Sequence, residues 1–430
     1  MYVSKITLKN IRGFESLEFD LSRGQDKYAG WTVFTGDNGS GKSTLLKAIA
    51  VAITGKDTAR ALEPNFHRWI RENSGNEEAS IELMIAPERG ADDFSSKGKT
   101  AYSTFPAKIV FHSTGKETSI EPIKSGGKKD LAPRGPWASG THGWFACGYG
   151  PFRRVFGASP DATRLMVGPA TERFVTMFNE AASLYEVDQW LRNLNHKRLE
   201  GKSAEKVQLE LLLEILRDDL MPNQLTVDRV DSDGLWLKDR NGLQLAWAEM
   251  SDGYRSALAL LTDILRHLIN AYGMQGLTER NAEGKLCIVR SGVVLIDEID
   301  AHLHPEWQRE IGFWLKRHFP NIQFLVTTHS PIICQAADQN GLFVLPEPGS
   351  DVKPRALTQE EYEKVIASRP DTILLSPAFG LQNTRSPRAV EGRSEYARLQ
   401  SKKRAGGNLT PEELAKFPQL QLFAETIEEV

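Results

Sequence analysis

Hydrophobic and polar residues alternate along 2–11 and again along 17–21, which is the pattern of strands with one buried face. These two stretches predict a hairpin that leads into a more continuously apolar strand at 31–36. A glycine-rich turn follows, and the apolar run 43–55 then predicts a buried helix that ends at Gly55. The start of the chain is therefore expected to run strand, strand, strand, turn, helix.

Alternation returns between 78 and 122, in the segments ASIELMIA, TAYSTF and AKIVFH, and predicts an antiparallel sheet. The next residues, 123–143, are rich in Gly, Lys and Pro and indicate a mobile loop. From about 171 to 220 apolar residues recur three and four positions apart, as in MFNEAASLYEVDQWLRNL and SAEKVQLELLLEILRDDL. This spacing predicts helices.

A strand pair is expected at LTVDRV and GLWLKD, followed by a helix that begins near Ser251. Next come a buried type of strand (SGVVLIDEI), a helix (PEWQREIGFWLKRHF) and another strand (IQFLVTTHS). A strand–helix–strand run of this kind predicts a largely parallel sheet covered on both faces. The last hundred residues contain a short strand, GLFVLP, and polar helical segments that end in an acidic tail.

Composition excludes several classes of protein. The 430 residues are 40% hydrophobic and 25% charged with a net charge of −3, so neither wholesale disorder nor a polycation is expected. Three cysteines without a CxxC pair indicate neither a disulfide framework nor a thiolate zinc site. No apolar run approaches the length of a membrane helix, and the alternating N-terminus does not resemble a signal peptide. We therefore expect a cytoplasmic protein with no membrane partner.

The segment 36–43, GDNGSGKS, fits the phosphate-binding pattern GxxxxGK[ST] between an apolar strand and a helix. Glycines allow backbone N–H groups to converge on phosphates, and the helix N-terminus adds its dipole. Lys42 would face the β- and γ-phosphates, while the Ser43 hydroxyl would bind Mg²⁺. A glycine-rich turn with an accidental lysine is the alternative, which the flanking elements disfavour. The predicted nucleotide-binding residues are Gly36, Asp37, Asn38, Gly39, Ser40, Gly41, Lys42, Ser43, Thr44 and, from the first hairpin, Arg12.

Two carboxylates, Asp297 and Glu298, end the apolar strand 293–296. Ligands of parallel α/β sheets bind at the carboxyl ends of strands, so this pair is expected beside the phosphate site. Asp297 would hold Mg²⁺, and Glu298 would polarise the attacking water as the catalytic group. An acidic pair that simply ends a strand is the alternative, which the presence of the glycine-rich motif makes less favourable.

Three later motifs resemble those of ABC-type ATPases of the SMC, RecF and OLD branch. EIDAHLHP (298–305) resembles the D-loop, with Asp300 and His302 as its marked residues, and MSDGY (250–254) loosely matches the signature. His329, directly after the next strand, resembles the histidine that senses the γ-phosphate. The resemblance covers about residues 1–60 and 245–345. It implies an ABC-ATPase head, a P-loop NTPase fold with a largely parallel core sheet, an antiparallel β lobe and an inserted helical segment.

In this class, the signature of one subunit closes on the nucleotide held by another. Ser251, Asp252 and Gly253 would therefore act in trans, and the chain would form a homodimer or a higher oligomer. Ser251 would also be the N-cap of its helix. No long heptad run is present, so a coiled-coil arm is not expected. The usual Q-loop glutamine is not found, and the turn GYGPFRR (148–154) is the candidate for its place. A zinc site at His302 and His304 is disfavoured, because no third ligand stands at a recognisable spacing.

A finer resemblance joins GYGPFRR, TERFVTMFNEAASLYEVDQWLRNL, MSDGYRS and DTILLSPAFGLQNTRSP to anti-phage defence ATPases of the Septu type, including those associated with retrons and an HNH nuclease. It implies a Mg²⁺-dependent ATPase that regulates a separate effector nuclease, of HNH or Toprim type. No acidic Toprim cluster is recognisable after His329, so the chain itself is not expected to be the nuclease. Arg153 and Arg154, beside Phe152, are interpreted as residues for nucleotide sensing or subunit contact.

Two other functions remain open at this point: a RecF-like repair ATPase that binds DNA ends or gaps, and a nucleotide-gated scaffold with slow hydrolysis. Nucleic acid could be bound through the partner or through basic loops, although solvated loops are the favoured interpretation of those charges. The basic loop residues are Lys124, Lys128, Lys129 and Arg134, with Lys402, Lys403 and Arg404 near the C-terminus.

The chain is expected to divide into four segments. They are 1–165, an ATPase half with the P-loop and β lobe; 166–225, a helical insert; 226–348, the second ATPase half, with the signature, the acidic pair, the D-loop and His329; and 349–430, a helical extension.

Overall fold

The computed structural model describes residues 1–72, 75, 77–95, 103–113, 117–123, 130–155, 168–350 and 352–424. The chain separates into two compact units, Met1–Pro370 and Asp371–Val430. Lys124, Lys128 and Lys129 of the basic loop, the first three residues of the TAYSTF segment and the acidic tail lie outside the described residues. Within the described part of the chain, no helix is long and apolar enough to cross a membrane.

The first unit is built on a sheet of six described strands in the order β16-β15-β3-β14-β13-β7. Neighbouring strands are parallel except for β16, which is antiparallel to β15. The predicted, largely parallel core sheet is therefore confirmed. The strands are β3 (Gly30–Gly36), β7 (Ala146–Tyr149), β13 (Gly292–Ile296), β14 (Ile322–Thr327), β15 (Leu342–Leu345) and β16 (Arg355–Ala356).

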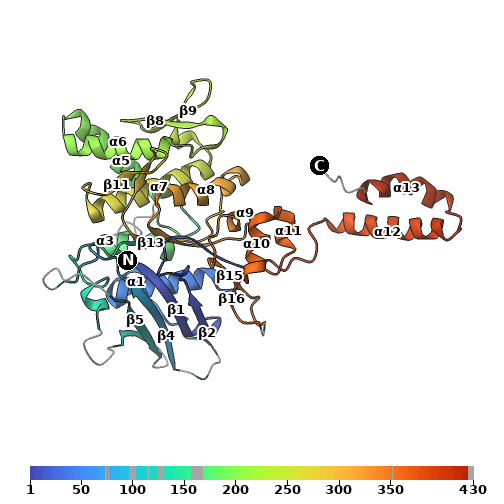
Figure 1. Ribbon diagram of the computed structural model, residues 1–430, viewed down its shortest axis with the longest axis horizontal. Coiled ribbons are helices and arrows are strands. Elements are labelled where there is room, and N and C mark those ends of the chain that lie inside the picture. Colours follow the sequence, from blue (N-terminus) through green and yellow to red (C-terminus); the bar gives the residue numbers. More distant parts are fainter. Residues whose placement is uncertain are drawn as a thin grey trace. The chain divides into compact units, whose positions relative to one another are not determined.

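An antiparallel sheet in the order β2-β1-β4-β5-β6 forms the β lobe, as the alternating segments predicted. Helix α1 (Lys42–Leu62) packs against both sheets, while α7 (Asp252–Tyr272) and α8 (Pro305–His318) contact β7 and β3 of the core sheet. Figure 1 shows α1 on one side of that sheet, and α7 and α8 on the other. The lobe strands are β1 (Tyr2–Ile11), β2 (Phe14–Asp20), β4 (Glu78–Ala86), β5 (Phe105–Ser113) and β6 (Thr118–Pro122).

Gly55 interrupts α1 instead of ending it. Its backbone is non-helical (φ 76°, ψ 173°), and helical residues continue to Leu62. A Cβ at this position would lie 2.7 Å from the Trp137 ring, whose Nε1 donates to the Ala52 carbonyl at 2.8 Å. The expected mobile loop is therefore anchored over its described part, because Trp137 packs on the break in α1.

The helical insert contains short helices α3 (Pro169–Glu172) and α4 (Val175–Phe178), then α5 (Tyr185–Leu199) and α6 (Ser203–Arg217). The first predicted helix, 177–194, is broken between α4 and α5. A three-stranded antiparallel sheet follows, and α5 and α6 both contact its strand β8. The further elements are β8 (Thr226–Asp231), β9 (Gly234–Lys238), β10 (Gln244–Ala246), β11 (Thr278–Arg280), β12 (Leu286–Ile288), α9 (Pro331–Cys334), α10 (Gln359–Ala367) and α11 (Pro370–Leu374).

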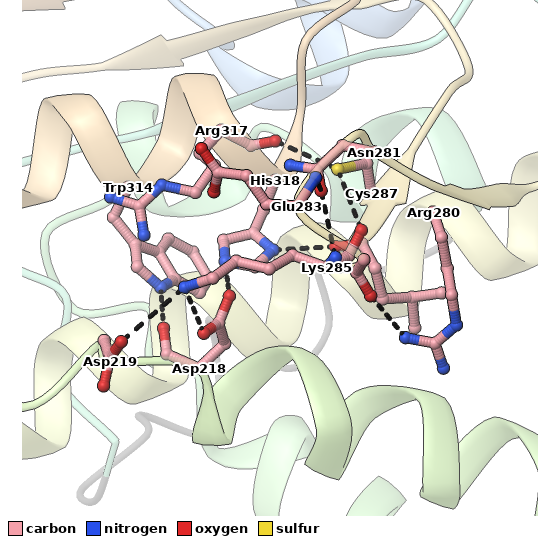
Figure 2. Close-up of polar contacts among 12 residues, drawn as sticks. Asp218, Asp219, Arg280, Asn281, Glu283, Lys285, Cys287, Trp314, Arg317 and His318 are labelled. Atoms are coloured by element: carbon pink, nitrogen blue, oxygen red, sulfur yellow. Dashed lines mark hydrogen bonds and ion pairs between the residues drawn. The ribbon is translucent and has the colours of Figure 1, made fainter.

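A polar cluster at the end of α6 ties the insert to the rest of the first unit (Figure 2). The Asp218 carbonyl accepts a 2.7 Å hydrogen bond from Trp314 Nε1 of α8, and its carboxylate lies 2.7 Å from Lys285 Nζ. His318 Nδ1 lies 2.8 Å from the Leu286 carbonyl, while its Nε2 is 3.1 Å from the Asp218 carboxylate. The cluster thus fixes the end of the insert on α8 and on the hairpin β11–β12.

The second unit contains two helices that pack on each other, α12 (Pro387–Arg404) and α13 (Pro411–Ala424). The rings of Tyr396 and Phe417 lie 5.0 Å apart, and Lys402 pairs with Glu413 at 2.7 Å. The predicted helical character of the C-terminal region agrees with these elements. The division into four segments expected from the sequence remains a prediction.

Candidate nucleotide site

The P-loop connects β3 to α1, and its glycines are required by its geometry. Gly36 (φ 148°) and Gly41 (φ 94°) have backbone conformations that residues with a Cβ rarely adopt. A Cβ on Gly36 would lie 2.2 Å from the Leu345 carbonyl oxygen, and one on Gly41 would lie 2.5 Å from the Phe14 ring. Gly41 is also the N-cap of α1. The loop can therefore wrap closely around a ligand only with glycine at these positions.

Lys42 is the first residue of α1 and is 6% exposed. Its Nζ donates to the carbonyls of Gly36 and Asp37, at 2.8 and 2.9 Å, so the ammonium group spans the loop. Burial lowers the pKa of Lys42, and the nearby carboxylates of Asp297 and Glu298 act in the opposite direction. The structure thus brings the lysine of the P-loop to the acidic pair, although the two motifs are about 250 positions apart.

The remaining loop residues are positioned as a phosphate cradle would require. Asp37, Asn38 and Gly39 are exposed at the tip, and Ser43 and Thr44 are half-buried in the first turn of α1. The Ser40 hydroxyl is buried and has no hydrogen-bond partner among the described residues. An unpaired buried hydroxyl at a helix N-terminus fits an anionic ligand such as the phosphates of ATP.

Asp297 and Glu298 follow β13, and a threonine of the adjacent strand β14 fixes their backbone. The Thr327 hydroxyl donates to Asp297 Oδ1 at 2.5 Å and accepts from the Glu298 N–H at 2.7 Å. Asp297 is 3% exposed, whereas Glu298 adopts φ 45°, a left-handed conformation that is strained for a residue other than glycine. The chain therefore turns sharply at the residue expected to polarise water.

The D-loop and the signature are in direct contact. Asp300 accepts a 2.5 Å hydrogen bond from the Thr328 hydroxyl, and His302, with φ 66°, is exposed. A Cβ on Gly253, in the first turn of α7, would lie 2.3 Å from the His302 carbonyl oxygen. Only glycine allows α7 to begin against the D-loop.

Ser251 is the N-cap of α7 by its backbone, but its side chain makes no capping hydrogen bond. The predicted N-cap position of Ser251 is therefore confirmed, although its hydroxyl does not cap the helix. Ser251 and Asp252 are both exposed, and Asp252 forms an ion pair with Arg255. The Ser251 hydroxyl is thus presented at the surface.

His329 is exposed directly after β14, and β14 lies between the strands that carry the P-loop and the acidic pair.

Arg12, which was also predicted to bind nucleotide, contacts another part of the chain. Its guanidinium lies over the Trp69 ring at 4.7 Å, and its charge interacts with Glu63 beyond the end of α1. The contacts described for Arg12 are thus with the segment that follows α1, and none of them joins it to the P-loop.

The sequence did not indicate that residues 146–149 form an edge strand of the core sheet. β7 pairs in parallel with β13, and the Tyr149 carbonyl accepts a 2.8 Å hydrogen bond from the Asp297 N–H. The turn after β7 brings Arg153 into the interior, 3% exposed, instead of to a surface where it could sense nucleotide directly. The motif GYGPFRR was visible, but its environment depends on the pairing of distant strands.

A buried ionic network holds the signature helix on β7. Asp263 of α7 accepts from Tyr149 Oη at 3.0 Å and from Arg266 Nε at 2.9 Å, and lies 3.2 Å from His267 Nε2. Burial alone would raise the pKa of Asp263, but His267 and Arg266 outweigh it and hold the pKa below its ordinary value. Asp263 is therefore an anion in the folded chain at neutral pH.

Asp263→Asn is expected to reduce the free energy of unfolding by about 3 kcal/mol at pH 7, because the buried guanidinium of Arg266 loses a charged partner. Since the native pKa lies below the ordinary 3.8, the loss should be constant down to about pH 5 and shrink only below pH 4. Urea unfolding across pH measures this, with the exposed Asp233→Asn as control. Equal stability of Asp263→Asn and wild type at pH 7 would show that the network adds nothing.

Comparison with known families agrees with this geometry. Residues 31–335 match the family model AAA_21, described as "AAA domain, putative AbiEii toxin, Type IV TA system". The chain belongs to this family. The resemblance inferred from the motifs, to P-loop ATPases of the SMC, RecF and OLD branch found in anti-phage defence, is therefore confirmed.

Two curated relatives align with most of this AAA_21 chain. The Septu protein PtuA of Bacillus mycoides (strain KBAB4) is 26% identical over 397 residues, which are 89% of this chain and 45% of that protein. The Retron Ec83 probable ATPase of Escherichia coli is 25% identical over 402 residues, 80% of this chain and 71% of that protein. The chain thus spans less than half the length of the first relative. A solved SMC head bound to the C-winged helix domain of ScpA has a TM-score of 0.47 at 16% identity, covering 84% of this chain and 99% of that one.

Proposed function

We propose that this AAA_21 protein is a Mg²⁺-dependent ATPase whose complete sites form between two copies of the chain. The observation that carries the proposal is the convergence of Lys42 with Asp297 and Glu298 at the carboxyl ends of parallel strands. The exposed start of α7, packed on the D-loop through Gly253, supplies the second face. One chain has one P-loop and one signature, so two chains complete two sites.

In this proposal each side chain of the site has a separate role in ATP hydrolysis. Lys42 and the N–H groups of the P-loop bind the β- and γ-phosphates, and Ser43 and Asp297 would hold Mg²⁺. The metal, when bound, neutralises charge that develops on the phosphate oxygens. Glu298 orients and polarises the attacking water, and His329 contacts the γ-phosphate from the next strand. Ser251 of the second copy closes over the same phosphate, as helix N-termini bind anions.

We further propose that hydrolysis regulates a separate effector nuclease in anti-phage defence. Support comes from the Septu and retron relatives, and from the absence of a recognisable Toprim motif in the sequence after His329. In this proposal the chain is the switch and the partner performs the cleavage.

The purified chain with ATP and Mg²⁺ or Mn²⁺ is expected to leave DNA and RNA intact, while a nuclease encoded beside it should co-purify and cleave. Both can be measured on gels with labelled substrates, with the partner alone as reference. Cleavage by the isolated chain that persists without ATP and in the Lys42→Ala variant would contradict the proposed division of labour.

A further inference from the structure

Arg153 is a buried arginine whose described hydrogen bonds all go to the main chain. Its guanidinium is buried in the turn after β7 and donates only to main-chain carbonyls in the hydrogen bonds described. Four of the five acceptors belong to the turn that follows β13. The five acceptors are the carbonyls of Gly150 (3.0 Å), Asp297 (2.9 Å), Glu298 (3.1 Å), Ile299 (3.4 Å) and Ala301 (3.4 Å).

Within the turn that Arg153 contacts, the Ala301 N–H donates to the Glu298 carbonyl at 2.9 Å, but no hydrogen bond described from the turn's own N–H groups reaches the carbonyls of Asp297, Ile299 and Ala301. Glu298 and His302 both have left-handed backbone conformations, so the chain coils tightly and its carbonyl oxygens converge. Buried carbonyls without donors are destabilising, and a guanidinium offers five N–H groups in a rigid fork. A lysine at this position would provide the charge without the fork.

The Arg153 side chain also remains charged. Burial lowers the pKa of its guanidinium to about 10, while the nearby carboxylates of Asp297, Asp300 and Glu298 act in the opposite direction. The group is therefore a cation at neutral pH, held under the backbone of the acidic turn.

The segment that carries Arg153 also borders the signature. Phe152 to Val155 line a cavity of about 300 Å³ together with Asp252, Arg255 and Ser256 of α7 and His302 of the D-loop. The neighbouring Arg154 lies over the Phe152 ring at 5.7 Å. A change at the signature face can thus reach the turn of Glu298 through one short segment.

We propose that Arg153 is a positioning residue for ATP hydrolysis, which holds the main chain of the 297–301 turn so that the Glu298 carboxylate faces the attacking water. Through the segment 152–155 it also connects that turn with the cavity at the start of α7. The inference rests on the proposed role of Glu298. Arg153 itself does not touch the nucleotide.

The test compares ATP affinity, kcat and thermal unfolding for Arg153→Met, Arg153→Lys and a matched control, Arg173→Met, in the full chain. Arg173 is a largely buried arginine near the same strand, but its guanidinium lies over the Phe145 ring at 5.4 Å. A fluorescent ATP analogue gives the affinity, and phosphate release gives kcat. Glu298→Gln serves as the benchmark for loss of the catalytic group.

Arg153→Met is expected to lower kcat by about 10²-fold, which is the loss of rate that a small misplacement of a reacting group causes. ATP affinity should stay near that of the wild type. Arg153→Lys should fall between Arg153→Met and wild type, and Arg173→Met should hydrolyse normally. If Arg153→Met does not fold, Arg153→Lys provides the test. Wild-type kcat in Arg153→Lys would overturn the proposal, because it would show that the guanidinium fork is not needed. A parallel loss of affinity and kcat, or an equal loss in Arg173→Met, would also overturn the proposal. Wild-type turnover in Glu298→Gln would instead refute the proposed catalytic role of Glu298, on which this inference rests.

Discussion

Lys42→Ala is expected to abolish tight ATP binding while leaving the fold intact. The ammonium group is the cation at the centre of the P-loop, where it bridges the carbonyls of Gly36 and Asp37. Its removal takes away the charge that faces the β- and γ-phosphates, but Lys42 is not part of the hydrophobic core. Calorimetric or fluorescence titration with ATP measures the loss, and far-UV circular dichroism should remain unchanged.

The matched control is Lys56→Ala, which removes a half-buried lysine of the same helix that pairs with the exposed Glu121 at 2.8 Å. It should bind ATP as the wild type does, because exposed ion pairs contribute little to stability. Wild-type affinity in Lys42→Ala would show that the P-loop does not hold the nucleotide.

Glu298→Gln is expected to retain ATP and to lower the rate of hydrolysis by roughly 10²–10⁴-fold, the usual contribution of a positioned acid–base group. The substitution is nearly isosteric and leaves Asp297, with its hydrogen bond from Thr327, in place. An amide cannot polarise water as a carboxylate does. Single-turnover phosphate release, with ATP binding measured in parallel, separates the two steps.

Glu310→Gln is the control for Glu298→Gln, since Glu310 is exposed on α8 and pairs only with its neighbour Arg309 among the contacts described. Its turnover should match that of the wild type. A Glu298→Gln chain that hydrolyses ATP at the wild-type rate would assign the catalytic role to another group.

Much of the fold could be predicted because its signals are local. The P-loop glycines, the apolar strands at 31–36 and 293–296 and the alternation of the β lobe each mark an element within a few residues. The order of the motifs then placed Lys42 and Asp297 at one edge of a parallel sheet. Both groups interact in the structure as this order requires.

The rest depended on contacts between distant segments. β7 has only four residues and is recognisable as a strand only by its pairing with β13, almost 150 positions later. The burial of Arg153 follows from that pairing, since the turn after β7 points it under the acidic turn. Arg12 stacks on Trp69 for a similar reason, because the isolated bridge between Ile11 and Ile70 brings the two segments together.

A mixed assembly of two defective chains tests the central claim, that a complete site needs two copies. Lys42→Ala leaves the signature intact but removes ATP binding, whereas Ser251→Arg leaves the P-loop intact but places a bulky side chain at the exposed start of α7. Each variant alone is expected to be inactive, with Ser251→Arg still binding ATP.

The decisive measurement is the steady-state ATPase rate of the two variants co-expressed with different tags and purified as one assembly. The account predicts that activity returns, because the P-loop of the Ser251→Arg chain meets the signature of the Lys42→Ala chain. A mixed assembly as inactive as either variant alone, or a Ser251→Arg chain that hydrolyses ATP at the wild-type rate by itself, would contradict it.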